Sequence, residues 1–115
     1  MRWEVGITCW IEQDGVVVLD DQRVALLDAI ERTGSLTAAA REQRMSYRAA
    51  WGQLRESEQR LGTRLVIGQS GGAAGGSMVL TPVGMEIVAR YRWFRDGLEV
   101  LAVQRFTQAF ADFEL

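Results

Sequence analysis

The chain contains no histidine and a single cysteine, Cys9, among its 115 residues. One thiol cannot form an internal disulfide, and without histidine or more cysteine the common zinc sites cannot be assembled. General acid-base and nucleophilic catalysis also lose their commonest side chains. Cys9 lies among apolar residues, which favours a packed, inert thiol over a nucleophile. The sequence therefore predicts a protein that is not an enzyme and has neither a metal site nor a cofactor.

Long apolar runs are missing as well. No uninterrupted apolar stretch approaches the roughly 20 residues that a membrane-spanning helix needs, and the first residues lack the pattern of a secretory signal. We therefore expect a cytoplasmic protein with no membrane partner. A chain of 115 residues fits one domain, residues 1–115, with room for a real core.

An excess of basic charge is the third feature that the sequence lacks. The formal net charge is −2, whereas nucleic-acid-binding domains are usually basic. The charge is unevenly distributed, because residues 41–64 hold six arginines and three glutamates, a local charge of +3 that leaves −5 for the rest. This segregation predicts one basic face on an otherwise acidic protein.

Residues 35–61 have the pattern of two short helices joined by a tight turn. Ser35 and Ser46 each precede a run with helical apolar spacing, so each hydroxyl can accept a hydrogen bond from a free N–H of the first helical turn. Three alanines at 38–40 combine high helix propensity with little bulk, which allows two helices to cross closely. We interpret residues 35–61 as a helix-turn-helix.

The second of these helices has two different faces. Residues at three- and four-residue steps predict a buried stripe: Tyr47, Ala50, Trp51, Leu54 and Leu61. On this basis Trp51 belongs to the core and is not a stacking platform for bases. The opposite face carries Arg48, Ala49, Gly52, Gln53 and Arg55. Arginine and glutamine can bind base edges in the major groove, but an ordinary surface helix with solvated arginines is an open alternative.

The segments before the helix-turn-helix predict a hairpin and a helix. Apolar alternation from Trp3 to Ile11, an Asp14-Gly15 pair and the run Val16–Leu19 indicate a β-hairpin over 3–19. Asp20 or Asp21 can cap a helix over 21–33. Gly34 can end this helix in the left-handed conformation.

After the helix-turn-helix, residues 65–80 predict a second hairpin with a glycine-rich tip, GQSGGAAGGS. This is not a nucleotide-binding loop, because no Lys-Ser or Lys-Thr pair follows the glycines into a helix. We interpret 65–80 as a wing that lies along DNA. With no arginine or lysine between residues 64 and 90, we expect its electrostatic contribution to be weak. The candidate wing residues are Gln69, Ser70, Gly71, Gly72, Gly75, Gly76 and Ser77.

The Thr81-Pro82 pair predicts the start of a long final helix, residues 82–113. Apolar residues recur there at alternating four- and three-residue steps, which is typical of a helix that pairs with another helix. Gly97 is a position where the helix could bend or break. The alternatives are dimerisation and folding back over the amino-terminal hairpin. The candidate dimerisation residues are Ile87, Tyr91, Phe94, Leu98, Leu101 and Phe106.

The order of these elements, with the strings TGSLTAAA, MSYRAAW, LGTRLV and GGAAGGSMVLTPVG, resembles the amino-terminal winged-helix domain of ModE-type molybdate-responsive transcriptional regulators. The resemblance covers about residues 3–106. The LGTRLV and LTPVG strings are also similar to LysR-type regulators. The fold class we expect is α+β, mainly α: a winged helix-turn-helix with an amino-terminal β-hairpin and a long carboxy-terminal helix.

The resemblance implies a dimeric, sequence-specific transcriptional regulator whose partner is double-stranded DNA. It further implies that the oxyanion-binding domain of full-length relatives is lacking, and it suggests molybdate or tungstate as an effector by family resemblance alone. Arg44 occupies a turn position that is often glycine in this family, so we expect a left-handed backbone there at a cost of about 1 kcal/mol.

We expect the base readers to be Arg48, Ala49 and Gln53, with Arg48 foremost, and phosphate contacts from Thr37, Arg44 and Tyr47. The full set of candidate DNA-binding residues is Thr37, Arg44, Ser46, Tyr47, Arg48, Ala49, Gln53 and Arg55. The alternative function is a protein-interaction or oligomerisation module on the same scaffold, which the acidic composition and the uncharged wing favour.

Overall fold

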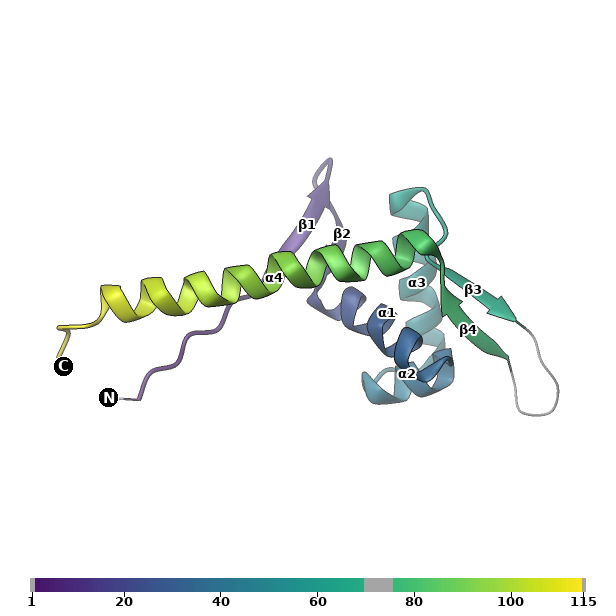
Figure 1. Ribbon diagram of the computed structural model, residues 1–115. Helices are drawn as coiled ribbons and strands as arrows, with labels where there is room; N and C mark the ends of the chain where they lie inside the picture. The colour runs from purple at the N-terminus through teal and green to yellow at the C-terminus, as the bar shows by residue number, and fades with distance from the viewer. Residues whose placement is uncertain (1, 70–75, 115) are drawn as a thin grey trace.

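Two antiparallel hairpins and four helices make up the chain over residues 2–69 and 76–114, which the computed structural model describes (Figure 1). The fold is the expected winged helix-turn-helix. In chain order the elements are β1 (Trp10–Gln13), β2 (Val16–Asp20), α1 (Asp21–Thr33), α2 (Leu36–Glu42), α3 (Tyr47–Leu61), β3 (Val66–Gln69), β4 (Ser77–Leu80) and α4 (Pro82–Ala109).

Side-chain caps set the start of each helix, as the sequence predicts. Each capping oxygen accepts a hydrogen bond from a backbone N–H in the first turn, which satisfies a donor that the helix itself cannot. Gly34 and Gly62 end α1 and α3 with φ of 71° and 70°, the left-handed region that glycine tolerates best. The four capping residues are Asp20, Ser35, Ser46 and Thr81.

The core is built around α1, which lies against α2, α3, β2, β4 and α4. Leu26, Leu27 and Ile30 of α1 are among the largest fully buried side chains. Ala39 and Ala40 of α2 are also buried, so the alanines let α2 pack closely, as expected. This core fixes the helix-turn-helix relative to both hairpins.

The wing hairpin pairs Val66 with Leu80 and Gln69 with Ser77. Its inner face is buried, whereas Ile67 and Val79 are exposed on its outer face. At its base, a Cβ on Gly84 of α4 would lie 2.4 Å from the carbonyl oxygen of Leu65, so only glycine permits this close approach. Of the candidate wing residues, Ser70, Gly71, Gly72 and Gly75 lie outside the described residues.

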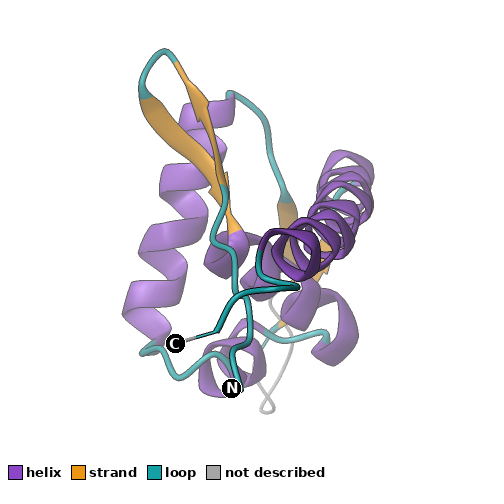
Figure 2. Cartoon of the chain, turned by 90° about the vertical axis from the view of Figure 1, so that its left-hand side faces the viewer, coloured by secondary structure: helices purple, strands orange, loops and turns teal. Residues whose placement is uncertain are grey.

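The amino-terminal hairpin is shorter than the sequence predicts. β1 begins only at Trp10, which pairs with Asp20 at the end of β2. Residues 3–9 therefore have no strand to pair with, because the chain turns into α1 directly after Asp20. They run extended beside α4 (Figures 1 and 2), where Arg95 donates to the carbonyl oxygen of Ile7 at 2.8 Å and the Trp3 and Phe110 rings are 5.1 Å apart.

The last helix continues through Gly97 without a break and ends at Ala109 rather than at residue 113. Its 28 residues span about 42 Å, and its far half extends beyond the helical core (Figure 1). The radius of gyration is 17.6 Å, against about 13 Å for a compact domain of 100 residues. Within residues 2–69 and 76–114, no helix is both long and apolar enough to span a membrane.

The candidate dimerisation residues do not share one environment. Tyr91 is 5% exposed, so it belongs to the core of the protomer and the prediction that it lies in a dimer seam is wrong. Ile87 is partly buried and packs against the core, and its part in a dimer stays a prediction. Leu98 and Phe106 are partly buried, while Phe94 and Leu101 are exposed. The reason is that α4 crosses the core only in its first half.

Candidate nucleic-acid interface

The turn between α2 and α3 has a defined backbone. Arg44 has φ of 57°, which confirms the left-handed conformation expected there. The N–H of Met45 donates to the carbonyl oxygen of Ala40 at 2.8 Å, and the Ser46 hydroxyl then accepts from the N–H of Ala49 at 3.0 Å. These bonds fix where the first turn of α3 leaves the body of the protein.

Three arginines near this turn have no hydrogen bond or ion pair from their side chains to any described part of the chain. Arg41 lies in the last turn of α2, Arg44 in the turn and Arg48 in the first turn of α3, and all three are exposed. Ala49 and Gly52 beside them are exposed and small. The result is an open basic surface with room for a base edge to approach Arg48.

The one carboxylate within this stretch, Glu42, is neutralised by another arginine. Arg32 donates to both oxygens of Glu42, at 3.0 and 2.5 Å, and also to Asp28 at 3.0 Å. The hydrogen bonds from Arg32 hold the pKa of the Glu42 carboxyl below its ordinary value. Glu42 therefore stays ionised and paired, and leaves the three exposed arginines unmatched.

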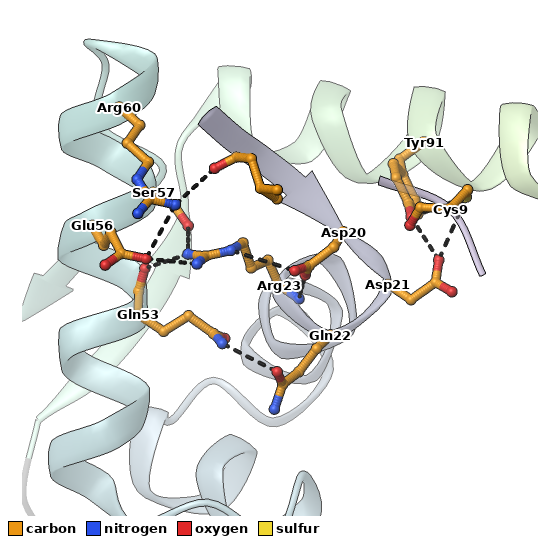
Figure 3. Close-up of polar contacts among 11 residues, drawn as sticks. Cys9, Asp20, Asp21, Gln22, Arg23, Gln53, Glu56, Ser57, Arg60 and Tyr91 are labelled. Atoms are coloured by element: carbon orange, nitrogen blue, oxygen red, sulfur yellow. Dashed lines mark hydrogen bonds and ion pairs between the residues drawn. The ribbon is translucent and has the colours of Figure 1, made fainter. Parts of the chain in front are cut away.

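The second half of α3 is clamped to the body by arginines with a different role (Figure 3). Arg23 of α1 donates to the Ser57 hydroxyl at 2.9 Å and to Glu56 at 2.6 Å. Arg60 donates to the carbonyl oxygen of Val17 in β2 at 2.8 Å, and Figure 2 shows the β1–β2 hairpin beside this end of α3. The hydrogen bond from Arg23 lowers the pKa of Glu56. Sequence reasoning missed Arg23, whose only signal is an arginine in the first turn of an apolar helix.

Gln53 belongs to this clamp and not to the open face. Its amide nitrogen donates to the side-chain oxygen of Gln22 at 3.4 Å (Figure 3), and its carbonyl oxygen accepts from Arg23 at 3.4 Å. Five residues at about 100° each turn Gln53 roughly 140° away from Arg48 around the helix. The expectation that both side chains share one base-reading face is therefore wrong.

The prediction that Trp51 and Tyr47 lie in the buried stripe of α3 is also wrong. The side chains are 36% and 56% exposed, so they do not belong to the buried stripe. The inward direction of α3 is set by Ala50, Leu54 and Ser57, which are buried, and Trp51 lies about 100° from Ala50. The guanidinium of Arg55 lies 4.4 Å from the centre of the Trp51 ring.

A buried carboxylate joins α3 to the wing. Glu58 is 7% exposed, and one of its oxygens accepts from the backbone N–H of Leu65 at 2.8 Å and of Val66 at 3.4 Å. The same oxygen pairs with Arg64 at 3.3 Å. Glu58 thereby satisfies the backbone where β3 begins and sets the position of the wing beside α3.

The candidate residues that lie toward the wing meet at a cleft. Thr37 of α2, Tyr47 of α3, Gln69 of β3, and Gly76 and Ser77 at the start of β4 line it together. The Ser77 hydroxyl is 3.4 Å from the side-chain oxygen of Gln69. The structure thus brings these five together on the wing side of α3, while Arg44 and Arg48 lie at its amino-terminal end.

A polar cluster joins α1, α4 and the amino-terminal segment. Asp21 accepts from Arg95 at 2.9 Å. It also accepts from the Tyr91 hydroxyl at 2.5 Å, and the Cys9 sulfur lies 3.9 Å from the same carboxylate (Figure 3). Arg95 is the main cause that lowers the pKa of Asp21, and burial raises the pKa of Tyr91. Cys9 is half-buried. No cluster of three or more metal-ligating side chains occurs in the described ranges.

Residues 22–85, which hold the helix-turn-helix and the wing, match the family described as bacterial regulatory helix-turn-helix proteins, lysR family. Among curated proteins, the molybdenum-pterin-binding protein MopB of Rhodobacter capsulatus is 46% identical over 80 residues, covering 70% of this chain and 30% of MopB. The DNA-binding transcriptional dual regulator ModE of Escherichia coli K12 is 32% identical over 91 residues, covering 79% of this chain and 34% of ModE.

The molybdenum transport protein ModE of Azotobacter vinelandii is 40% identical over 82 residues, covering 71% of this chain and 30% of that ModE protein. The chain thus spans about a third of the length of these curated relatives. Among solved structures, ArgP from Mycobacterium tuberculosis superposes with a TM-score of 0.56 at 24% identity, over 76% of this chain and 31% of ArgP. That likeness concerns the fold alone.

Proposed function

Because the chain belongs to the lysR family of bacterial regulatory helix-turn-helix proteins, we propose that it is a sequence-specific DNA-binding transcriptional regulator that acts as a dimer. The observation that carries the proposal is the open surface of Arg41, Arg44 and Arg48. An acidic protein in which three neighbouring arginines around the α2–α3 turn have no partner among the described residues has a surface suited to a polyanion.

The roles follow from position on the helix-turn-helix. In this proposal Arg48, beside the small residue Ala49, reaches a guanine edge in the major groove, where paired hydrogen bonds to one base carry sequence information. Arg44 and Thr37 contact phosphates, which fix orientation without reading sequence. Ser46 acts through its cap on α3. Gln53, which α1 holds, has no part in base reading.

The dimer is proposed to form through the outer face of α4. Positions 90, 94, 97, 101 and 104 follow the alternating four- and three-residue spacing of a helix-pairing seam. Phe94 and Leu101 on this seam are exposed, and the neighbouring Trp93 is 82% exposed. Gly97 lies between them, and a Cβ built on it meets nothing within 4 Å. A second copy of α4 would cover these side chains.

Sedimentation equilibrium on the whole chain tests the dimer. We expect the wild type to be a dimer and Leu101→Arg to be a folded monomer, because the new charge would be buried without a partner. Val103→Arg serves as a matched control because Val103 is 53% exposed and lies about 160° around α4 from Leu101, away from the seam. A wild type that is monomeric at every concentration would contradict the proposed interface.

Selection from random DNA duplexes at two salt concentrations tests DNA recognition. We expect the wild type to enrich a palindromic site, and Arg48→Ala to bind that site more weakly by about 1–3 kcal/mol with relaxed preference at one base pair. Half-sites should lie about 34 Å apart, or a multiple of that distance, if both recognition helices engage one face of the duplex.

Arg92→Ala is the matched control, since it removes the same charge from an exposed site on α4 outside the proposed seam, where Arg92 pairs with Asp28 at 2.9 Å. Equal losses on every sequence would make Arg48 a phosphate contact. A folded wild type that enriches no duplex would favour the second function, a protein-interaction module, which the exposed apolar face of α4 supports. Binding to a protein partner would then show little salt dependence, in contrast to DNA binding.

An oxyanion effector, molybdate or tungstate, is a separate part of the proposal that the names of the relatives suggest. A ligand that binds only the folded state raises the unfolding temperature with concentration. The unfolding temperature measured with molybdate, with tungstate and with sulfate as the comparison therefore tests whether the chain binds either effector. Equal curves in all three salts would remove the effector from the proposal without touching DNA binding.

A further inference from the structure

Residues 3–9, the amino-terminal strap, run beside the far half of α4 (Figure 1), and a cleft of about 510 Å³ lies between the two. Val5 and Ile7 line this strap cleft on one side, and Val100 and Val103 line it on α4. The two valines of α4 are 59% and 53% exposed. Ligand pockets usually measure about 300–1,000 Å³, so the protomer leaves open an apolar surface large enough for a ligand.

The backbone of the strap has no partner strand in the described parts of the chain. Its contacts at one edge are with α4: the carbonyl oxygen of Ile7 accepts from Arg95 at 2.8 Å, and that of Cys9 lies 3.4 Å from the Tyr91 hydroxyl. Alternate residues of an extended chain direct their N–H and C=O groups to the same edge. The groups of residues 4, 6 and 8 therefore face the other edge, where a second strand can pair with them.

There is space for such a strand beside the middle of the strap. A Cβ built on Gly6 meets nothing within 4 Å. Glu4 and Thr8, which flank Gly6 at alternate positions, are exposed. The strap is thus an open strand edge next to an apolar cleft, a combination that an extended peptide can satisfy in both respects.

A carboxylate adds a charge to the lining of the strap cleft. Within the described residues, Glu99 is the one ionised side chain of this lining, and it is 61% exposed. It pairs with Arg95 at 3.3 Å, but Arg95 already binds both oxygens of Asp21. A ligand with a positive charge next to its apolar part is therefore complementary to this cleft.

A second copy at the proposed dimer seam does not cover the strap cleft. Glu99 and Val103 each lie about 160° around α4 from Leu101, so the cleft and the seam face opposite sides of the helix. A dimer formed through the seam leaves one strap cleft open on each copy. A small apolar molecule could fill the cleft but would leave the backbone of the strap unpaired.

We propose that the strap cleft binds an extended strand of another protein, in which apolar side chains alternate with polar ones and a basic residue lies next to Glu99. The strand pairs with the free edge of the strap, and its apolar side chains fill the space between Ile7 and Val103. The proposal does not rest on DNA binding. Because the far half of α4 extends beyond the helical core (Figure 1), the chain can hold this partner while the α2–α3 turn stays open.

Selection from a random library of seven-residue peptides, with the whole chain as the target, tests the proposal. We expect the wild type to enrich peptides in which apolar residues alternate with polar ones, with a basic residue among the polar positions. Val103→Arg should bind an enriched peptide at least about tenfold more weakly, as expected for lost apolar contact. The new arginine fills the cleft and pairs with Glu99 four residues earlier.

Leu101→Arg is the matched control. It places the same residue on the opposite side of α4, so it should bind the peptide normally although it no longer forms the dimer. Glu99→Gln should weaken binding by about threefold, as expected for an exposed ion pair, and should lower its salt dependence. Equal losses in Val103→Arg and Leu101→Arg, or no loss in either, would overturn the proposal.

Single N-methyl groups along the enriched peptide test the strand pairing. Each methyl removes one backbone donor, so binding should be lost at every second position and kept at those between them. A wild type that enriches no peptide, or a scan without this alternation, would overturn the proposal and leave the DNA-binding function untouched. Assemblies larger than a dimer that Val103→Arg abolishes would identify the occupant as a second copy, and this also overturns the proposal.

Discussion

The arginines at the two ends of the recognition helix have opposite roles. At the amino-terminal end, Arg44 and Arg48 are exposed and have no partner in the described parts of the chain. At the carboxy-terminal end, Arg60 and the incoming Arg23 are bound to Glu56, Ser57 and backbone carbonyl oxygens. The same residue type is thus available for a ligand at one end and structural at the other.

This difference explains how a chain with a net charge of −2 can have a basic surface. Ion pairs neutralise the structural arginines locally. Of the arginines whose side chains have no partner among the described residues, Arg41, Arg44 and Arg48 lie together at the α2–α3 turn, whereas Arg2 and Arg105 lie elsewhere. The electrostatic field that a polyanion meets depends on where the charges lie on the surface, and ion pairing determines which of these charges stay uncompensated. Substitutions at the two ends should therefore separate stability from binding.

The largest effect on stability is expected for Arg23→Ala. It should lower the free energy of unfolding by about 3 kcal/mol, because it removes the hydrogen bonds of Arg23 to the buried Ser57, to the carbonyl oxygen of Gln53 and to Glu56, which keeps only its ion pair with Arg60. Urea unfolding followed by circular dichroism measures this. Arg41→Ala removes an exposed, unpaired arginine and should stay within about 0.5 kcal/mol of the wild type. Equal losses in the two variants would show that the distinction between the two groups of arginines is wrong.

Glu58→Ala should come next, with a loss of about 2 kcal/mol. The substitution leaves the backbone N–H of Leu65 buried without an acceptor. Glu58→Gln keeps an acceptor oxygen and should lose less than half as much, which chemical denaturation of both variants can measure. If both lost the same amount, the charge and its pairing with Arg64 would matter more than the backbone hydrogen bonds.

Arg44→Gly should separate backbone strain from charge. Glycine relieves the left-handed strain of about 1 kcal/mol, partly offset by the greater freedom of glycine in the unfolded chain, so stability should rise by up to about 1 kcal/mol. DNA affinity should fall, with a salt slope lower by about one. Arg44→Ala should weaken binding equally without the gain in stability. Unchanged affinity in both variants would remove Arg44 from the phosphate contacts.

The smallest expected effect is on the pH dependence of unfolding. Arg95 lowers the pKa of Asp21 in the folded state, so the folded state binds a proton less readily than the unfolded chain. The stabilisation is therefore complete above the ordinary pKa of about 4 and is lost as pH falls below it.

Asp21→Asn should flatten the dependence of the unfolding temperature on pH below about pH 4, measured by calorimetry. Asp96→Asn is the control, since Asp96 is exposed on α4 and its side chain makes no hydrogen bond or ion pair within residues 2–69 and 76–114. A flattening of the same size in both variants would assign the effect to net charge and not to the contact with Arg95.

Local chemistry let the sequence alone determine most of the element boundaries. The caps at Ser35, Ser46 and Thr81, and the left-handed glycines at 34 and 62, depend on neighbours within four residues along the chain. The wing and the helix-turn-helix followed from the same signals. The fold class could therefore be predicted before any packing was known.

Tertiary structure decided which side of each helix is open. The 3.6-residue period identifies a stripe but not its edges, and it predicts Trp51 in the core and Gln53 on the open face. In the structure Gln53 is bonded to Gln22 of α1, and Trp51 lines the cleft between α3 and the wing hairpin. Strand pairing likewise needs a partner, which residues 3–9 lack. The pairing of Arg23 with Glu56 joins residues 33 positions apart, and no local sequence pattern predicts such a pair. Which arginines stay without a partner among the described residues is therefore a property of the folded protein and not of the sequence pattern.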